Sequence, residues 1–370
     1  MSKRILIFHS SNDLYGASKI LIQVINQLNK NGYETHIFLP YKGPLDQLLD
    51  VKQIKITHLN FGVFRRKYFN ILGLLNRFFK IFFSIFKIVR YVKQNNIDII
   101  YTNTSIVLAS GISAFLCKVP NYVHIHEIPY NKFYVKIMGF LISMFSSKII
   151  VVSKSVKSYW SKYVSKPLTL IYNGIPKTKI QRIVKSPTKK IKFLTIARLL
   201  PYKGHKYIIE IATNIKKKNI NSEFIFLGDT FKGYESYENE LKQMSKDLGL
   251  EKNILFKGFD SNISKYMSQS DFLLHGATDP DPLPTVIFEA IQHKLPVIST
   301  CIGGPVEILD HGNGGLLIPV DDAFRASEKI LNYISDFKFI EKKKQYSMNF
   351  IEKEFSEKKF NKKILEFFNE

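Results

Sequence analysis

Short, continuously apolar segments alternate with amphipathic helical segments along almost the whole chain. At the start, Arg4–Phe8 reads as a buried strand and Gly16–Asn29 as a helix with its apolar residues on one face. Gly32 stands where a helix-ending glycine is expected, and Thr35–Leu39 predicts the next strand. Strands separated by helices form a parallel sheet with helices on both faces. The alternation therefore predicts an α/β fold of the doubly wound kind.

The same pattern predicts the remaining elements of both halves. In the first half we expect strands at Ile97–Tyr101, Tyr122–Ile125 and Lys148–Val152, and a helix near Tyr134–Phe145. In the second half we expect strands at Lys192–Ala197, Glu223–Leu227, Asn253–Phe256, Asp271–Leu274, Pro296–Ser299 and Leu316–Ile318. Helices are expected there at His205–Lys217, Tyr237–Leu248 and Thr285–Gln292, followed by a helical tail over Phe324–Phe368.

The alternation lapses once, at residues 176–190. This stretch reads PKTKIQRIVKSPTKK, which is polar, basic and broken by Pro187, and is typical of a linker that can serve as a hinge. A chain of 370 residues has room for two domains of ordinary size. We expect two Rossmann-like domains, over 1–180 and 181–350, facing across a central cleft. A C-terminal helix over 351–370 is expected to pack back toward the first domain.

The positive charge of the chain is confined to one stretch. The formal net charge is +23, yet residues 51–209 alone contain 28 lysines and arginines against two acidic residues, Asp98 and Glu127. Within residues 64–93 there are eight basic residues, seven phenylalanines and no acid. The basic and aromatic residues alternate at helical spacing: Arg77, Lys80, Lys87 and Arg90 among Phe78, Phe79, Phe82, Phe83 and Phe86.

Two interpretations of this basic, aromatic segment remain open. It resembles an interfacial amphipathic helix that lies on an anionic membrane. Alternatively, it is a domain helix whose phenylalanines belong to the core and whose cations are solvated. No recognised nucleic-acid motif accompanies the charge, so nucleic acid is not an expected partner.

Three features of the sequence favour a cytoplasmic location. The chain has two cysteines, Cys117 and Cys301, which cannot form a disulfide framework. The N-terminus turns polar after one short apolar run and does not read as a signal peptide. The apolar stretch at 137–147 falls short of the roughly 20 residues of a spanning helix. We expect a soluble or peripheral protein.

Polar residues cluster where predicted strands of the first half end. The loop HSSNDLYGAS lacks the GxGxxG pattern, which disfavours a nicotinamide or flavin enzyme, although Gly16 still lets backbone amides approach a ligand. Strand alternation places His124 and His126 on the same face. These histidines could bind a metal, could be structural, or His126 could hydrogen-bond a polar substrate.

The second half offers charged groups at its strand ends. Arg198 and Lys203 follow the strand 192–197 and suit a diphosphate that leaves with negative charge. The carboxylates of Asp281 and Glu289 flank the helix start at Thr285, whose amides can bind phosphate. Each carboxylate can accept hydrogen bonds from sugar hydroxyls. The segment Gly303–Glu307 follows another strand in the same region.

Together these stretches resemble the family 4 glycosyltransferases, which have the GT-B fold. The resemblance rests on LYGAS, HIHE, VSKS (152–155), YNGI (172–175), ARLLPYKG, DPLPTVIFE and PVISTCIGGPVEI, in this order over most of the chain. It implies a retaining glycosyltransferase (a hexosyl or glycosyltransferase of EC class 2.4) that uses a UDP-, GDP- or dTDP-sugar and needs no metal or other cofactor. The implied acceptor is a glycan or a polyprenyl-diphosphate-linked saccharide, as in bacterial O-antigen, lipopolysaccharide or capsule assembly.

The resemblance also implies roles for particular residues. Arg198 and Lys203 would hold the diphosphate, and Glu289 would bind the donor ribose. Asp281 would take hydroxyls of the donor sugar, and His126 would lie beside the reacting centre. Further donor contacts are implied at Gly16, Gly258, Phe259, Pro284, Thr285 and Val286.

One residue departs from the family pattern. The family usually has Glu where this chain has Asp281, which is one methylene shorter, so we expect a variant donor preference. Under this reading the basic first domain binds the acceptor and docks on the inner face of the cytoplasmic membrane. The alternatives are another GT-B enzyme, such as a nucleotide-sugar epimerase or a phosphorylase, and a catalytically inactive scaffold that binds a membrane or a polyanion.

Overall fold

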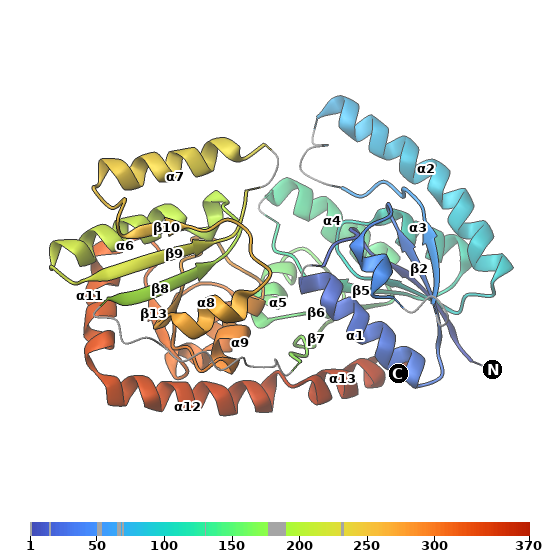
Figure 1. Cartoon of the computed structure of the whole chain (residues 1–370). Coiled ribbons are helices and arrows are strands. Elements are labelled where there is room, and N and C mark those ends of the chain that lie inside the picture. The colour runs from blue at the N-terminus through green and yellow to red at the C-terminus, as the bar shows by residue number, and fades with distance from the viewer. Residues whose placement is uncertain are drawn as a thin grey trace. The chain divides into compact units, whose positions relative to one another are not determined.

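The protein consists of two compact units, each built on one parallel sheet (Figure 1). The computed structural model describes residues 2–14, 16–49, 54–64, 68, 70–129, 131–176, 190–230 and 233–370. The first unit combines Met1–Gly174 with Glu357–Glu370, and the second is Ile175–Ser356. Most of the expected linker, together with the expected boundary at 180/181, lies at 177–189, outside the described residues.

The first unit contains a seven-stranded sheet in the order β3-β2-β1-β4-β5-β6-β7. The strands are β1 (Arg4–Phe8), β2 (Glu34–Leu39), β3 (Ile54–His58), β4 (Ile99–Thr102), β5 (Asn121–Ile125), β6 (Lys148–Val151) and β7 (Leu168–Leu170). The helices are α1 (Gly16–Lys30), α2 (Ile71–Gln94), α3 (Leu108–Cys117), α4 (Lys132–Phe145), α5 (Lys154–Trp160) and α13 (Glu357–Asn369), with a 3-10 turn at η1 (Pro44–Gln47). The strand order reverses between β1 and β4, where such folds place their ligands.

Side chains of β1 alternate between two cores, one on each face of this sheet. Ile5 and Ile7 pack with α1 and α13, whereas Leu6 and Phe8 pack with α2 and α3. The C-terminal helix α13 contributes four buried residues to the first of these cores: Phe360, Ile364, Phe367 and Phe368. The last residues of the chain thus complete the core of the first unit, while residues 351–356 belong to the second.

The second unit repeats the architecture with a six-stranded sheet in the order β10-β9-β8-β11-β12-β13. The strands are β8 (Ile191–Ile196), β9 (Ser222–Leu227), β10 (Ile254–Phe256), β11 (Phe272–His275), β12 (Val297–Thr300) and β13 (Leu316–Ile318). The helices are α6 (His205–Lys217), α7 (Glu235–Asp247), α8 (Ile263–Gln269), α9 (Thr285–Gln292), α10 (Gly304–Ile308), α11 (Ala323–Ser335) and α12 (Phe337–Glu354), with 3-10 turns at η3 (Pro201–Lys203) and η4 (Asp310–Gly312). Here the strand order reverses between β8 and β11. The doubly wound α/β fold predicted from the sequence is confirmed.

Helix α2 presents its phenylalanines to solvent. Ile81, Ile88 and Val92 face the interior, while Phe78 and Phe83 are 63% and 62% exposed. The interpretation of the phenylalanines as core residues is therefore wrong. Residues 65–67 and 69 of the basic segment lie outside the described residues. Within the described part of the chain, no helix has the length and apolarity needed to cross a bilayer.

Arg77 differs from the other cations of α2. It is 5% exposed, and its guanidinium carbon lies 3.8 Å from the centre of the Tyr68 ring. Both interpretations of the segment expect its four helical cations on the outer surface, but Arg77 is buried. Its position falls on the same side of the helix as Ile81 and Ile88.

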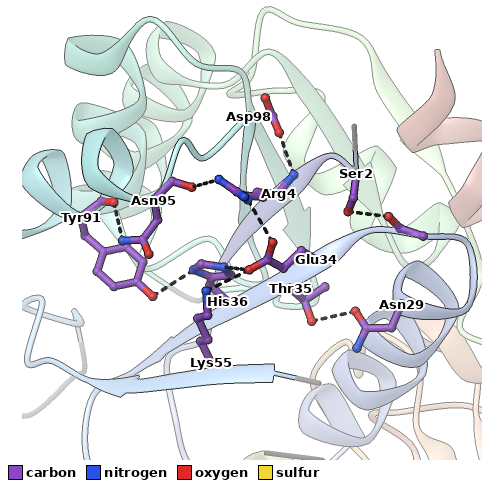
Figure 2. Close-up of polar contacts among 11 residues, drawn as sticks. Ser2, Arg4, Asn29, Glu34, Thr35, His36, Lys55, Tyr91, Asn95 and Asp98 are labelled. Atoms are coloured by element: carbon purple, nitrogen blue, oxygen red, sulfur yellow. Dashed lines mark hydrogen bonds and ion pairs between the residues drawn. The ribbon is translucent and has the colours of Figure 1, made fainter. Parts of the chain in front are cut away.

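A polar network fixes the last turn of α2 at the amino ends of the strands (Figure 2). Arg4 donates from Nη1 to the carbonyl oxygen of Asn95 at 3.0 Å and from Nε to Glu34 at 3.0 Å. The His36 ring shares a 2.9 Å hydrogen bond with the hydroxyl of Tyr91. Hydrogen bonds from Lys55 and His36 lower the pKa of Glu34 to about 2, so this carboxylate stays ionised.

Candidate active site

The second unit brings Lys203 and Asp281 into direct contact at the point where its strand order reverses. Lys203 follows β8 and Asp281 follows β11, and the ammonium of Lys203 forms an ion pair with the Asp281 carboxylate. His275, at the end of β11, places Nε2 3.5 Å from Asp281 Oδ2. Burial raises the pKa of Asp281, but Lys203 and His275 outweigh it and hold this pKa well below its usual value. The Asp281 carboxylate is therefore ionised at neutral pH.

Glycines allow the loops around this pair to approach one another closely. Gly204, which precedes α6, has φ +74°, and a Cβ there would lie 1.7 Å from the carbonyl oxygen of Gly276. Gly304 donates its amide to the carbonyl oxygen of Asp281 at 2.7 Å, and a Cβ on it would lie 2.3 Å from Pro282 O. The ARLLPYKG and CIGGP segments therefore hold the Asp281 loop in place.

The other residues expected to bind a donor lie on the loops and helices that follow the strands of this sheet. Arg198 is half-buried just after β8, and Glu289 is half-buried in α9. Thr285 and Val286 open α9 behind Pro284, and the described residues supply no side-chain cap to that helix. Its first amides are thus placed to bind an anion.

Gly258 and Phe259 follow β10 and are held by the loop after β9. The Phe259 amide donates to Asp229 Oδ1 at 2.9 Å, and the Gly228 amide donates to Gly258 O at 2.8 Å. The Phe259 ring is 68% exposed. An exposed aromatic ring beside fixed backbone groups suits a planar ligand such as a nucleobase.

The first unit gathers a chain of hydrogen-bonded polar groups at the equivalent edge. His9 follows β1, Asn103 follows β4 and His126 follows β5. Asn103 Oδ1 lies 2.9 Å from His126 Nε2, and Asn103 Nδ2 lies 3.2 Å from His9 Nδ1. His9 Nε2 lies 3.0 Å from Ser18 Oγ, which donates to Asp13 at 2.9 Å.

The amide of Asn103 determines the tautomers along this chain. Its oxygen can only accept, so His126 donates from Nε2; its nitrogen can only donate, so His9 accepts at Nδ1. The Nδ1 atom of His126 is thus left as an acceptor in the neutral ring. Burial, reinforced by His124 and His9, holds the pKa of His126 well below its usual value, and burial lowers that of His9 to about 4. His126 is therefore an uncharged hydrogen-bonding group at neutral pH.

His124 lies beside His126, as strand alternation predicted, with the ring centres 4.1 Å apart. Its Nδ1 lies 2.6 Å from the hydroxyl of Tyr101, and burial lowers its pKa to about 3. The described residues contain no group of three or more His, Cys, Asp or Glu side chains that could hold a metal ion. The hydrogen bond between His124 and Tyr101 and the one from His126 to Asn103 make this histidine pair a hydrogen-bonding element.

Glu127 and Gly16 also lie near this edge. The Glu127 carboxylate accepts from the amide and hydroxyl of Ser105, at 3.2 and 3.1 Å, and from the amide of His126 at 3.2 Å. Glu127 therefore links the β4 and β5 loops. Gly16 begins α1, two residues before Ser18 of the polar chain; Tyr15 lies outside the described residues.

Sequence reasoning missed His9, Asn103, Tyr101, Asp229 and His275. Each lies within two residues of the end of a strand, which is the signal that could have found them. Apart from His9, which opens the HSSNDLYGAS loop, none belongs to a stretch that drew attention by its spacing or charge.

Comparison with known proteins gives two family matches and several relatives. The family described as Glycosyltransferase Family 4 matches residues 15–179, and the family described as Glycosyl transferases group 1 matches residues 176–352. The chain is 26% identical over 168 residues to the putative colanic acid biosynthesis glycosyltransferase WcaL of Salmonella typhimurium, covering 43% of this chain and 40% of WcaL.

A second relative is the N-acetylgalactosamine-N,N'-diacetylbacillosaminyl-diphospho-undecaprenol 4-alpha-N-acetylgalactosaminyltransferase of Campylobacter jejuni. It is 26% identical over 215 residues, covering 56% of this chain and 55% of the relative. The chain thus matches between two fifths and just over half of the length of these two curated relatives.

Among solved structures, HepE of Anabaena in complex with UDP and glucose is similar over 99% of both chains, with a TM-score of 0.80 and 23% identity. This likeness shows the GT-B fold. Because the two family matches overlap at residues 176–179 and together extend over residues 15–352, the chain belongs to the family 4 glycosyltransferases.

Proposed function

We propose that the protein is a retaining glycosyltransferase that moves a sugar from a nucleotide diphosphate sugar to a lipid-linked or saccharide acceptor. The observation that carries the proposal is the charged Lys203–Asp281 pair at the strand reversal of the second unit. A pair of this kind offers a cation to a diphosphate and a carboxylate to sugar hydroxyls. The UDP and glucose bound by HepE favour a UDP-sugar over GDP- and dTDP-sugars.

Donor binding is assigned to the second unit. Lys203 has three N–H donors, so it can bind a phosphate oxygen while it keeps Asp281. Arg198 and the first amides of α9 would bind the remaining phosphate oxygens, Glu289 the ribose, and Gly258–Phe259 the base. These fixed cations and amides would stabilise the departing diphosphate, so we propose that no metal is required.

In the proposed reaction, the acceptor hydroxyl attacks the anomeric carbon on the face that the diphosphate leaves. The bond from this carbon to the diphosphate oxygen breaks through an oxocarbenium-like state, and the hydroxyl proton passes to the departing phosphate. His126 would accept a hydrogen bond at Nδ1 from a sugar hydroxyl and orient it, since its low pKa leaves it uncharged. It would act neither as a nucleophile nor as a cationic acid.

The first unit would bind the acceptor and dock on the inner face of the cytoplasmic membrane. Support comes from α2, whose exposed phenylalanines lie beside Lys87, Arg90 and Lys93, and from exposed Phe115 and Phe140 on α3 and α4. Exposed aromatic and cationic residues of this kind suit an anionic bilayer. The named relatives in colanic acid and undecaprenol-linked glycan assembly favour a role in bacterial surface polysaccharide assembly, such as O-antigen, lipopolysaccharide or capsule.

The reaction is tested by incubating the protein with UDP-, GDP- and dTDP-sugars and a polyprenyl-diphosphate-linked saccharide. We expect one nucleotide class to support transfer, NMR to show that the product keeps the anomeric configuration of the donor, and EDTA to leave the rate unchanged. Lys203→Met should lower the transfer rate by about 100-fold or more. Lys206→Met, which removes an exposed lysine of α6, should leave the rate nearly unchanged. Epimerisation of the donor alone, or turnover only with orthophosphate, would contradict the proposal.

Membrane docking is tested separately by sedimentation with vesicles. Vesicles rich in phosphatidylglycerol should retain the protein at moderate salt, whereas phosphatidylcholine vesicles should not. Phe78→Ser/Phe83→Ser, which removes two exposed rings, should reduce retention without lowering the melting temperature. Equal retention on both vesicle types would contradict docking.

A further inference from the structure

A groove of about 730 Å³ opens on the surface of the first unit between α2 and α3. Most of its lining is apolar: Phe82, Ile85, Phe86 and Val89 of α2, and Ile112 and Leu116 of α3. The remaining lining residues are Arg90, Lys93 and Gln94, all in the last two turns of α2. The groove therefore has an apolar body and a cationic end, and none of these lining residues is acidic.

The apolar body of this groove is in contact with water in the free protein. Phe86 is 61% exposed and Leu116 is 54% exposed. A ligand that covers this apolar surface removes it from water, which favours binding. The volume lies within the range of small-molecule sites, roughly 300–1,000 Å³.

The cationic end lies away from the edge where His126 is found. The last turn of α2 is tied to the amino ends of the strands by the hydrogen bond from Arg4 Nη1 to Asn95 O and by the one between the Tyr91 hydroxyl and His36 Nδ1 (Figure 2). His126 follows the carboxyl end of β5 in the same parallel sheet. An anion held by Arg90 and Lys93 is therefore at the opposite edge from the polar chain of His9, Asn103 and His126.

We propose that this groove binds one acyl chain of an anionic bilayer phospholipid, with the lipid phosphate between Arg90 and Lys93. The charge of the groove end complements such a phosphate, and the body matches a hydrocarbon chain. The lipid is distinct from the acceptor, because its phosphate lies at the edge away from His126. This inference deepens the proposed membrane docking and rests on it: the protein binds one lipid in a defined site as well as the bilayer surface.

The test uses dihexanoylphosphatidylglycerol below its micellar concentration, measured by titration calorimetry. We expect saturable binding at one site, little binding of dihexanoylphosphatidylcholine, and none of inorganic phosphate. Arg90→Gln/Lys93→Gln should weaken binding at least tenfold. The matched control Lys80→Gln/Lys87→Gln also removes two α2 cations but none that line the groove, and should change the affinity less than twofold.

A second variant probes the apolar body. Leu116→Trp places a larger ring in the groove from an exposed position, so it should weaken binding at least fivefold without lowering the melting temperature. The site is overturned if the wild type binds no monomeric lipid saturably, if the two double variants lose affinity equally, or if Leu116→Trp has no effect. The calorimetric titration contains no vesicle, donor or acceptor. Its outcome is therefore distinguishable from a failure of membrane docking or of transfer, which the vesicle and transfer assays measure.

Discussion

The two units have the same topology at their strand reversals but opposite electrostatic character there. In the second unit, Lys203 and Asp281 form an ion pair in which the low pKa of the carboxyl keeps it ionised. In the first unit, His9, Asn103 and His126 form a hydrogen-bonded chain in which burial keeps both imidazoles neutral. The first arrangement suits a charged diphosphate and the second suits neutral hydroxyls.

This contrast shows that the fold provides the place and the loop residues provide the chemistry. Parallel sheets with reversed strand order put loops at one edge in both units. Which groups meet there depends on a few residues directly after the strands, such as Lys203 after β8 and Asn103 after β4.

The largest expected effect comes from removing the cation of the Lys203–Asp281 ion pair. Lys203→Met leaves the Asp281 carboxylate largely buried without its main partner, so the pKa of Asp281 should rise. Transfer should fall by about 100-fold or more, as when one electrostatic contact to the leaving group is lost. Steady-state kinetics measures this loss, with Lys206→Met as the control; a loss under fivefold would contradict the role of Lys203.

A smaller effect is expected in the hydrogen-bonded chain of His9, Asn103 and His126. Asn103→Leu removes the acceptor of the His126 Nε2 proton, so the ring is no longer held in one tautomer. We expect kcat to fall about 10- to 100-fold, at or below the lower end of the effects of positioned acid–base groups, with little change in KM for the donor.

Asn103→Asp sharpens the same prediction. A carboxylate beside His126 favours its protonated form, so the pKa of His126 should rise and a new acidic limb should appear in the pH–rate profile. An unchanged profile together with an unchanged kcat for Asn103→Leu would show that Asn103 only supports the fold.

The two units should also respond differently to mild acid. Among the described residues, burial lowers the pKa of His9, His36, His124 and His126 in the first unit, but only of His205 in the second. A lowered histidine pKa gives stability that is present above the unfolded value of 6.5 and is lost as pH falls toward the folded value. For His9, with a folded pKa of about 4, this loss is on the order of 2 kcal/mol at pH 5.

Hydrogen exchange at pH 7 and pH 5, corrected for intrinsic rates, measures this difference. Amides of β1 and β5 should lose more protection than those of β8 and β11. Asp281 adds nothing in this window, because its lowered pKa affects stability only below its unfolded value of 3.8. Equal losses of amide protection in both units would contradict the assignment of neutral imidazoles to His9 and His126.

The smallest effect concerns the charged network at the other edge of the first unit. Glu34→Gln removes a carboxylate whose pKa is lowered to about 2 by Lys55 and His36. Because Glu34 is about one third exposed, solvent screening reduces its contribution, and we expect a loss of about 1 kcal/mol at pH 7. Denaturant unfolding measures this loss of stability. If Glu34→Gln also lowered the transfer rate, the two edges of the first unit would not have separate roles.

Much of the fold could be predicted because strands and helices differ in apolar period. The boundaries of β1, α6 and α9 follow directly from runs and stripes of apolar residues. Helix α3 was missed because its sequence, LASGISAFLC, is rich in small residues and carries Gly111, where a Cβ would lie 2.9 Å from Phe145 Cβ. Its helical form depends on this close packing, which periodicity does not report.

The candidate site, like the fold, could be predicted from the sequence only in part. Lys203 and Asp281 could be predicted from charge, proline and loop position, but their ion pair depends on loop contacts such as Gly304 N to Asp281 O. The Asn103 side chain has no charge and no motif, and its role follows from two neighbours 94 and 23 residues away. Such a contact requires the strand order, which spacing along the chain does not provide.

The most direct test of the contrast between the units is calorimetric titration of UDP into the wild type, Glu289→Gln and His126→Ala. We expect UDP affinity to fall at least tenfold in Glu289→Gln, because the ribose loses a carboxylate acceptor, and to stay within about twofold in His126→Ala. Loss of UDP affinity in His126→Ala with none in Glu289→Gln would contradict the assignment of the nucleotide to the second unit.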